Sequence, residues 1–488
     1  MSGANLKSGS WVLLDNLFAA VVAFGFFVVS ARVLSPCAFG VAALAISVAQ
    51  IATPMIESLF HDAIIQREDL QPDDVQTAFT TALLWSIVIA ALLILASPAI
   101  ASLTGAPPLA QYLPWMALSV LASGLVAIPS ALARRQMDFR ALAIRTILAR
   151  TIATIIGLVL IFRGVGIWGV VVQAIAAALL SAVFILIVMR PSFRLLIDRT
   201  RLGYLLRFAS ASMGTQLLLF ASSRVFTLLM SGLLGPVAAA TWAVALRFVE
   251  PLQVMAATTL GQFTLPIYSR KQADRAALEG LFLSGSRRAS LVLVPMFVGL
   301  AACAGPIITL FVGEQWLAAA PLMAVICLVF AVVASRQLVE ITLTSLGAPQ
   351  LNLVVQAAAI LLSLVGFAIG ARAGLFDATL GWSLRALPFV TVAAWFLYSR
   401  AGISLGKQCV AVAPVFAASG VMAAAVIAAQ RTLLVGHGTI VTLIGSIATG
   451  VVSYLIAALL LDRHTRSDLM QLHAWRRGAA MIEPPPID

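Results

Sequence analysis

Charged residues are scarce in this chain. Aspartate, glutamate, lysine and arginine make up 10% of its 488 residues, and hydrophobic residues make up 61%. A soluble globular protein carries about 25% charged residues. The mean hydropathy is +1.04, so there is too little polar surface to cover a soluble core. The composition therefore predicts an integral membrane protein with little mass outside the membrane.

Cysteine and histidine are also rare, with four of each. The cysteines are far apart and show no paired spacing, which predicts neither a disulfide framework nor a metal site. The histidines show no metal-ligand spacing, and no nucleophile–base set accompanies them. We therefore predict a protein that is not an enzyme, with no catalytic residues, no metal and no cofactor.

The net charge is +12, which in a soluble protein would suggest nucleic acid as a partner. Here no basic run is interleaved with aromatic residues, and no zinc-ligand or RNA-binding signature is present. The basic residues gather instead in alternate loops between apolar runs, which is the positive-inside pattern of membrane proteins. We expect contact with membrane lipids and no nucleic-acid binding.

Apolar runs of about 20 residues, long enough to cross a bilayer as helices, recur from end to end. They predict an all-α, polytopic protein with fourteen spans. The first seven lie at 11–34, 38–60, 77–103, 112–133, 141–162, 166–189 and 207–234. The other seven lie at 238–266, 289–312, 319–345, 351–374, 379–398, 409–430 and 439–461.

The loop charges test this count. With the N-terminus placed in the cytoplasm, twenty-one of the 31 lysines and arginines lie in cytoplasmic loops and tails, and four lie in external loops. This asymmetry predicts that both termini are cytoplasmic and that the number of spans is even. A missed or an additional pair of spans would satisfy the same rule, so twelve spans stay open beside fourteen.

The remaining six arginines lie within predicted spans. An arginine at the bilayer centre costs roughly 2.5–3.5 kcal/mol on insertion scales, so it seldom faces lipid. Arg150, Arg224 and Arg247 lie nearest mid-span, and Arg336 lies toward the cytoplasmic third. Arg145 and Arg385 lie near span ends, where a long side chain can reach the interface. The pattern predicts a polar, net-positive cavity that suits an anionic substrate.

Four carboxylates share these spans: Asp15, Glu57, Glu250 and Glu340. Glu250 lies three residues after Arg247, and Glu340 lies four residues after Arg336, so each acid shares a helix face with an arginine. Structural ion pairs are therefore one interpretation. The other is that the acids bind a coupling ion, a proton or sodium, during transport.

A short turn recurs along the chain. Leu34-Ser35-Pro36 follows the first predicted span, and Leu234-Gly235-Pro236 follows the seventh, with an offset of 200 residues. Six spans between them predict a parallel repeat of two six-helix bundles. We expect the N-terminal bundle at 1–189, an amphipathic connector at 190–206, the C-terminal bundle at 207–398, two further spans within 399–461, and a cytoplasmic tail at 462–488.

Four segments resemble the polysaccharide transport family of lipid-linked oligosaccharide flippases, part of the multidrug/oligosaccharidyl-lipid/polysaccharide exporter superfamily. Their order and their position relative to the spans carry the resemblance, which covers roughly residues 8–400. The segments are the turn Leu34-Ser35-Pro36-Cys37-Ala38-Phe39-Gly40, the basic loop Arg134-Arg135-Gln136-Met137-Asp138-Phe139-Arg140, Gly164-Val165-Gly166-Ile167-Trp168-Gly169, and the turn beginning Phe311-Val312-Gly313-Glu314-Gln315-Trp316.

The resemblance implies two six-helix bundles arranged as a V, with spans one, two, seven and eight facing a central cavity. It thereby adds Asn16 and Gln216 to Arg150, Arg224, Arg247 and Arg336 as candidate substrate-binding residues. It also implies a bacterial inner-membrane location, an undecaprenyl-diphosphate-linked oligosaccharide as substrate, and a polysaccharide polymerase and export machinery as partners.

Three alternatives stay open at this point. A cation-coupled multidrug exporter of the same superfamily would favour acids and aromatic residues over arginines in its cavity. A flippase for the peptidoglycan lipid precursor is the second, and no feature of the sequence excludes it. A membrane polymerase or ligase of glycans would need a large external loop with catalytic groups, and the predicted external loops are all short.

Overall fold

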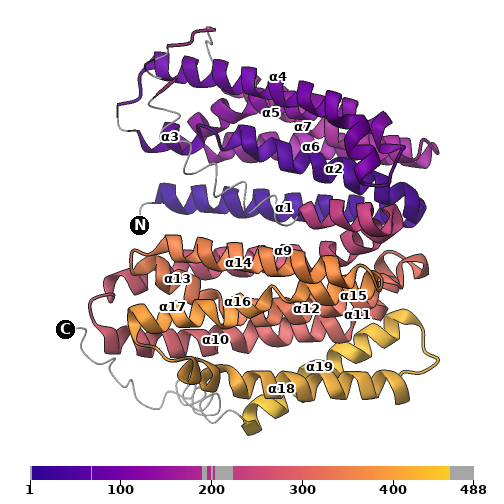
Figure 1. Ribbon diagram of the computed structural model, residues 1–488, viewed down its shortest axis with the longest axis vertical. Helices are drawn as coiled ribbons and strands as arrows, with labels where there is room; N and C mark the ends of the chain where they lie inside the picture. The colour runs from indigo at the N-terminus through magenta and orange to yellow at the C-terminus, as the bar shows by residue number, and fades with distance from the viewer. Residues whose placement is uncertain are drawn as a thin grey trace. The chain divides into compact units, whose positions relative to one another are not determined.

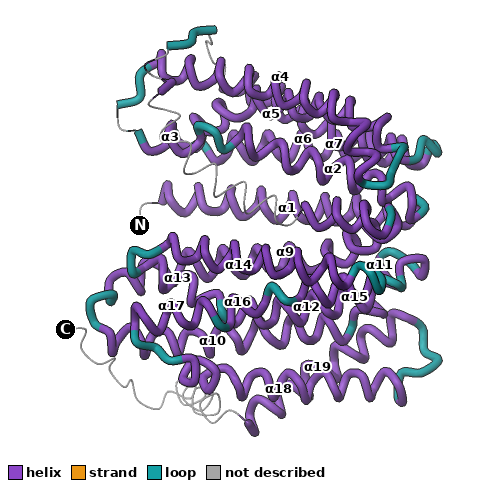
Figure 2. The backbone as a smooth tube through the Cα atoms, viewed as in Figure 1, coloured by secondary structure: helices purple, strands orange, loops and turns teal. Residues whose placement is uncertain are grey.

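The computed structural model describes residues 3–67, 69–189, 195–198, 200, 202–203 and 224–461. Every regular element in these ranges is a helix, joined by short loops (Figure 2). Within these residues, eleven helical segments are long and apolar enough to cross a membrane, and the shorter helices Leu17–Val33 and Arg224–Leu234 are apolar as well. The prediction of an all-α, multi-pass membrane protein is confirmed.

The chain divides into two compact units, Met1–Arg247 and Phe248–Asp488. We call them the N-terminal unit and the C-terminal unit, and helix α9 runs across the boundary between them. The long helices of the N-terminal unit run side by side (Figure 1). Its helices are α1 (Gly3–Val33), α2 (Pro36–Glu57), α3 (His61–Gln66), α4 (Pro72–Leu103), α5 (Leu109–Arg135), α6 (Phe139–Phe162), α7 (Ile167–Met189), the Arg224–Leu234 helix and the first part of α9 (Pro236–Arg270).

The C-terminal unit is also built from helices, but several of its spans are interrupted. Its helices are the rest of α9, α10 (Arg275–Ala302), α11 (Ala304–Phe311), the short 3-10 helix η1 (Glu314–Trp316), α12 (Ala319–Ser335), α13 (Gln337–Ser345), α14 (Pro349–Gly370), α15 (Leu375–Ser383), α16 (Ala386–Val390), α17 (Val392–Ala401), α18 (Leu405–Thr432) and α19 (Thr439–Leu461).

Each of the fourteen predicted spans coincides with helix in the described part of the chain, and the seventh is described only from Arg224 onward. The tenth span is divided at Arg336 into α12 and α13, and the twelfth is divided into α15, α16 and α17. The predicted domain limits remain a sequence-based prediction. Most of the 190–206 connector and all of the 462–488 tail lie outside the described residues.

Helix starts follow the local sequence. The Ser35 hydroxyl accepts a hydrogen bond from the Ala38 N–H, and Pro36 occupies the first position of α2. A proline there loses no helical hydrogen bond, because the first N–H groups of a helix have no partner within it. The Asp138 carboxylate caps α6 by accepting from the Ala141 N–H at 3.0 Å. These caps fix where the spans that line the cavity begin.

One helix lies at the centre of each unit. Helix α5 packs against α2, α4 and α7, whereas the α12–α13 span packs against α10 and α15. These two are the most deeply buried of the candidate spans. They are the fourth and the tenth predicted spans, so they occupy equivalent places in the proposed six-span repeat.

The two proline-containing turns meet within the N-terminal unit. Gly40 of α2 lies so close to the start of α9 that a Cβ atom at this position would overlap the Pro236 carbonyl oxygen. Nearby, the Ser231 hydroxyl donates to the Thr104 carbonyl at 2.6 Å. The helix that ends at Leu234 and the start of α9 are thus tied to α2 and to the end of α4 through close backbone contacts.

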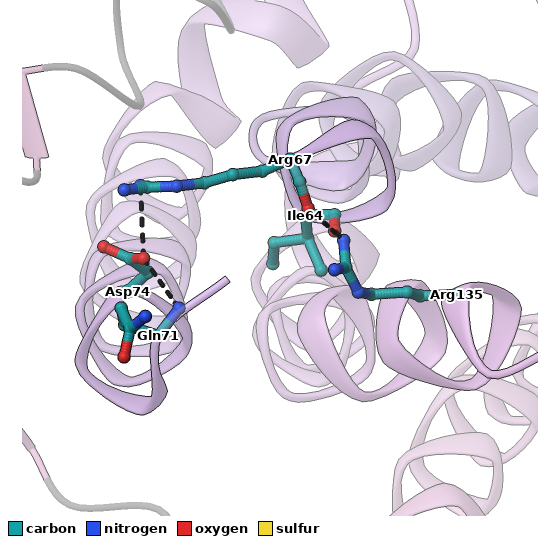
Figure 3. A network of polar contacts seen from close by, with 5 residues as sticks. All are labelled: Ile64, Arg67, Gln71, Asp74 and Arg135. Carbon is teal, nitrogen blue, oxygen red and sulfur yellow. Dashed lines mark hydrogen bonds and ion pairs between the residues drawn. The ribbon is translucent and has the colours of Figure 1, made fainter. Parts of the chain in front are cut away.

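A polar network ties α3 to its neighbours at the opposite end of α2 (Figure 3). Arg135, at the end of α5, donates to the carbonyls of Ile64 at 2.8 Å and Ile65 at 3.3 Å, and also to that of Arg67. Arg67 in turn pairs with the buried Asp74 carboxylate at 3.1 Å. The guanidinium group of Arg135 therefore satisfies carbonyls that the short helix α3 leaves unpaired at its end.

Replacing Arg135 by alanine is expected to destabilise this end of the N-terminal unit by about 2 kcal/mol, since hydrogen bonds to charged groups contribute roughly 1.5–3 kcal/mol. Thermal unfolding of the purified protein, together with proteolysis of the loop between α3 and α4, measures the effect. Arg140→Ala is the control, because Arg140 is exposed at the start of α6. Equal stability of both variants would contradict the role of the network.

Candidate substrate cavity

A cavity of about 640 Å³ lies within the N-terminal unit. Its walls are formed by residues of α2, α5, α6 and α7, with Arg224 added from the following helix and His61 from α3. This volume lies in the range of roughly 300–1,000 Å³ that is typical of ligand sites.

Arginine dominates the charge of the cavity wall. Arg134, Arg145, Arg150 and Arg224 line it, and Glu57 is the acidic side chain among the lining residues. The Glu57 side chain is exposed, although its helix packs inside the unit, because it faces the cavity. The cavity is therefore net positive, as the intramembrane arginines predict.

Arg145 makes the densest set of polar contacts in the cavity. Its Nη1 donates to the Ser130 hydroxyl of α5 at 2.7 Å. It also interacts electrostatically with the carboxylates of Glu57 and Asp15. Its Nε is buried and has no protein hydrogen-bond partner. Arg145 thus balances two acids and keeps one donor unused.

Asp15 comes to this group from α1, which packs against α6. Its carboxylate interacts electrostatically with Arg145 and Arg150, and the Thr146 side chain lies beside it. Its Oδ1 atom is buried without a hydrogen-bond partner. Because a buried unpaired acceptor is costly, this carboxylate depends on the neighbouring guanidinium groups.

Arg150 lies five residues beyond Arg145 on α6 and is exposed to the cavity. Its Nη1 donates to the Ala19 carbonyl of α1 at 3.4 Å, a long contact that leaves most of the guanidinium group available. Together, the α6 arginines present several N–H donors to the same space. A guanidinium fork matches the oxygen atoms of a phosphate group in a bidentate manner.

The other predicted residues of the N-terminal half differ in placement. Arg247 is not among the residues that line this cavity; its Nη2 donates to the Ala23 carbonyl at 3.3 Å, and its Cζ lies 5.9 Å from the Phe27 ring centroid. Asn16 lies on α1, but its side chain falls outside the described part, as does Gln216 as a whole. Their roles in substrate binding stay predictions.

Arg336, Glu250 and Glu340 belong to the C-terminal unit. Arg336 is buried, and it donates to the Phe389 carbonyl at 3.3 Å and to the Gln408 side-chain oxygen at 2.5 Å. The alternative of an Arg336–Glu340 ion pair is wrong, because the helix is interrupted at Arg336 and its side chain turns toward α16 and α18. Glu250 lies on α9, one residue before Pro251.

Sequence reasoning missed part of the cavity wall. The sequence pattern places Arg134 in a cytoplasmic loop and Arg145 near a span end, from where its side chain could also reach the interface, yet both line the cavity. The signal is present on α5, where small polar residues recur along one helix face. They are Ser119, Ser123 and Ser130, followed by Arg134. Polar residues spaced four or seven apart in an apolar span share one helix face and indicate that it is turned toward a polar space.

Fold and cavity together define a multi-pass membrane protein with a basic internal cavity, which is the architecture of a transporter. Residues 29–321 match the model of the polysaccharide biosynthesis protein family. The chain belongs to this family, so the family resemblance of its sequence is confirmed.

One curated relative is the succinoglycan biosynthesis transport protein ExoT of Rhizobium meliloti (strain 1021). It is 25% identical over 323 residues, which cover 66% of this chain and 65% of that protein. The match thus spans slightly less than two thirds of the relative's length.

Solved structures share the fold. The lipid II flippase MurJ in an inward closed conformation superposes with a TM-score of 0.73 at 14% identity, covering 94% of this chain and 99% of that chain. An inward-facing multidrug resistance transporter of the MATE family within the MOP superfamily gives a TM-score of 0.56 at 15% identity, covering 83% and 96%. At these identities the similarity shows the fold alone.

Proposed function

We propose that this protein moves an anionic undecaprenyl-diphosphate-linked oligosaccharide across the bacterial inner membrane for surface polysaccharide biosynthesis, by alternating access of its cavity. The observation that carries the proposal is the cavity of four arginines and one glutamate within the N-terminal unit. A diphosphate needs several fixed cations, and arginine supplies them without losing its charge. The polysaccharide biosynthesis family and the succinoglycan transport relative support the coarser part of the proposal, which is transport in a polysaccharide pathway.

The membrane potential favours export of such an anion. Moving one charge across 100 mV corresponds to about 2.3 kcal/mol. Two phosphate charges that leave a negative cytoplasm thus gain roughly 4–5 kcal/mol per 100 mV on the same basis. After release, Asp15 and Glu57 lie beside Arg145 and offset its charge in the empty cavity. We propose that these acids assist the return step.

Deletion of the gene in its native host tests the proposal. We expect loss of a surface polysaccharide and accumulation of its lipid-linked intermediate on the cytoplasmic side, both restored by the wild-type chain. Increased drug sensitivity with normal polysaccharide would favour the multidrug exporter. Arrest of cell-wall synthesis with accumulated peptidoglycan precursor would favour the precursor flippase.

The proposed topology places both termini in the cytoplasm. Alkaline phosphatase inserted at Gly436, in the loop between α18 and α19, is expected to be active, because this loop is external in the topology. A green fluorescent protein fused to the C-terminus is expected to fluoresce. Inactive phosphatase at Gly436 together with a non-fluorescent C-terminal fusion would show that the protein has the opposite orientation in the membrane.

A further inference from the structure

A polar group in the C-terminal unit lies outside the cavity described above. Gln337, Glu340 and Thr344 lie on successive turns of α13, and Asn352 and Gln356 lie one turn apart on α14. The two helices pack against each other. The amide nitrogens of Gln337 and Gln356 approach the two Glu340 carboxylate oxygens at 3.5 and 3.4 Å, which is the long limit for a hydrogen bond.

The Glu340 carboxylate has no basic partner among the described residues. Arg336, four residues earlier, is engaged by the Phe389 carbonyl and by Gln408 instead. A carboxylate within a membrane span is costly unless a positive charge compensates it. Two weak amide contacts do not supply that charge, so the carboxylate takes up either a proton or a bound cation.

Asn352 adds a second, independent observation. Its Nδ2 donates to the Glu340 carbonyl at 2.9 Å and to the Thr344 hydroxyl at 3.1 Å. These two bonds fix the orientation of the amide, and its oxygen, Oδ1, is buried without any hydrogen-bond partner. The unpaired Oδ1 atom of Asn352 and the uncompensated carboxylate of Glu340 thus belong to the same polar group. A bound cation would interact favourably with both.

The chemistry of the group selects the kind of cation. Each of these side chains carries oxygen, the ligand that hard cations prefer, and none carries sulfur or imidazole. There is one carboxylate, whereas calcium sites usually combine several. Side-chain amides can present oxygen in place of nitrogen by rotating about their last bond. One negative charge among neutral oxygens matches a monovalent ion.

We propose that Glu340, Thr344, Asn352 and Gln356 form a sodium-binding site between α13 and α14. The ion binds the carboxylate of Glu340 and the Oδ1 atom of Asn352, with the rotated amide of Gln356 adding a further oxygen. Coupling of this ion to substrate movement rests on the function proposed above, whereas sodium binding itself does not.

Thermal unfolding of the purified full-length protein tests the site without substrate. Unfolding temperatures are measured across a NaCl titration, with choline chloride holding ionic strength and chloride constant. We expect a saturable rise of roughly 3 °C for the wild type, because a ligand that binds only the folded state raises its stability. Glu340→Gln keeps the side-chain size and is expected to lose the rise.

Matched variants distinguish loss of sodium binding from a folding defect. Glu314→Gln removes an exposed acid of the same unit and is expected to keep the full sodium response. Thr344→Val and Asn352→Ala leave the carboxylate in place and are expected to raise the half-saturating sodium concentration about tenfold, as loss of a supporting group typically does at ion sites. The sodium response of these two variants tests the site even if Glu340→Gln does not fold.

An unfolding temperature that does not respond to sodium in the wild type would overturn the site, and so would an unchanged response in Glu340→Gln. Neither result would affect the arginine cavity, because it lies in the N-terminal unit and is tested by polysaccharide assays. Conversely, normal polysaccharide in the deletion strain would contradict the proposed function without contradicting sodium binding.

Discussion

Replacing Arg145 by alanine is expected to lower translocation of the lipid-linked oligosaccharide about 100-fold, since removing one member of a buried charge pair costs roughly 2–5 kcal/mol. Arg145 contacts Ser130 and interacts with Glu57 and Asp15, so alanine leaves Glu57, which lines the cavity, and Asp15 beside it without this cation. Surface polysaccharide and the accumulated intermediate, measured in a deletion strain that carries the variant, give the result.

Two further variants separate loss of charge from loss of folding. Arg163→Ala removes an exposed arginine just after the other end of α6 and is expected to behave as wild type. Arg145→Lys keeps the charge but not the fork, and is expected to restore part of the transport with normal protein levels. Wild-type transport by Arg145→Ala would mean that this arginine does not hold the substrate.

Substitution of Gly40 by alanine is expected to have the opposite effect from the same substitution at Gly25. Alanine is favoured over glycine in helices by about 0.5–1 kcal/mol. At Gly25 of α1 the added Cβ meets no atom within 4 Å, so stability rises. At Gly40 the same atom would overlap the Pro236 carbonyl, and overpacking of this kind typically costs about 1–3 kcal/mol.

Unfolding temperatures of the two variants measure the change in stability, and polysaccharide assays show whether transport changes with it. We expect a lower unfolding temperature and reduced transport for Gly40→Ala only, because the backbone contact between α2 and the start of α9 must open. Equal stability of both variants would show that the helices can separate there without cost.

The helices were largely predictable from the sequence. Apolar runs long enough to span a bilayer are a local property, and the loop arginines predict the orientation of the spans independently. Ser35-Pro36 and Asp138 begin α2 and α6 where capping chemistry predicts. The short motifs then predicted the family, which the match over residues 29–321 confirms.

The details of the cavity were less predictable, because they depend on helix rotation and on interruptions that hydropathy does not record. The sequence predicts Arg336 as a cavity residue, a role that stays a prediction, but it gives no sign of the helix interruption that directs this side chain to Gln408. Arg134 was predicted as a loop residue, yet it continues the polar face of α5 into the cavity. A contact such as that between Arg145 and Ser130 joins two helices and exists only after they pack.

Reconstituted translocation tests the account most directly. The purified protein in liposomes is offered two substrates with the same oligosaccharide, one on undecaprenyl diphosphate and one on a neutral polyprenyl carrier. If guanidinium groups of the cavity hold the diphosphate, only the first is moved, and pyrophosphate in excess slows it. Equal movement of both substrates would contradict the central role of the arginines.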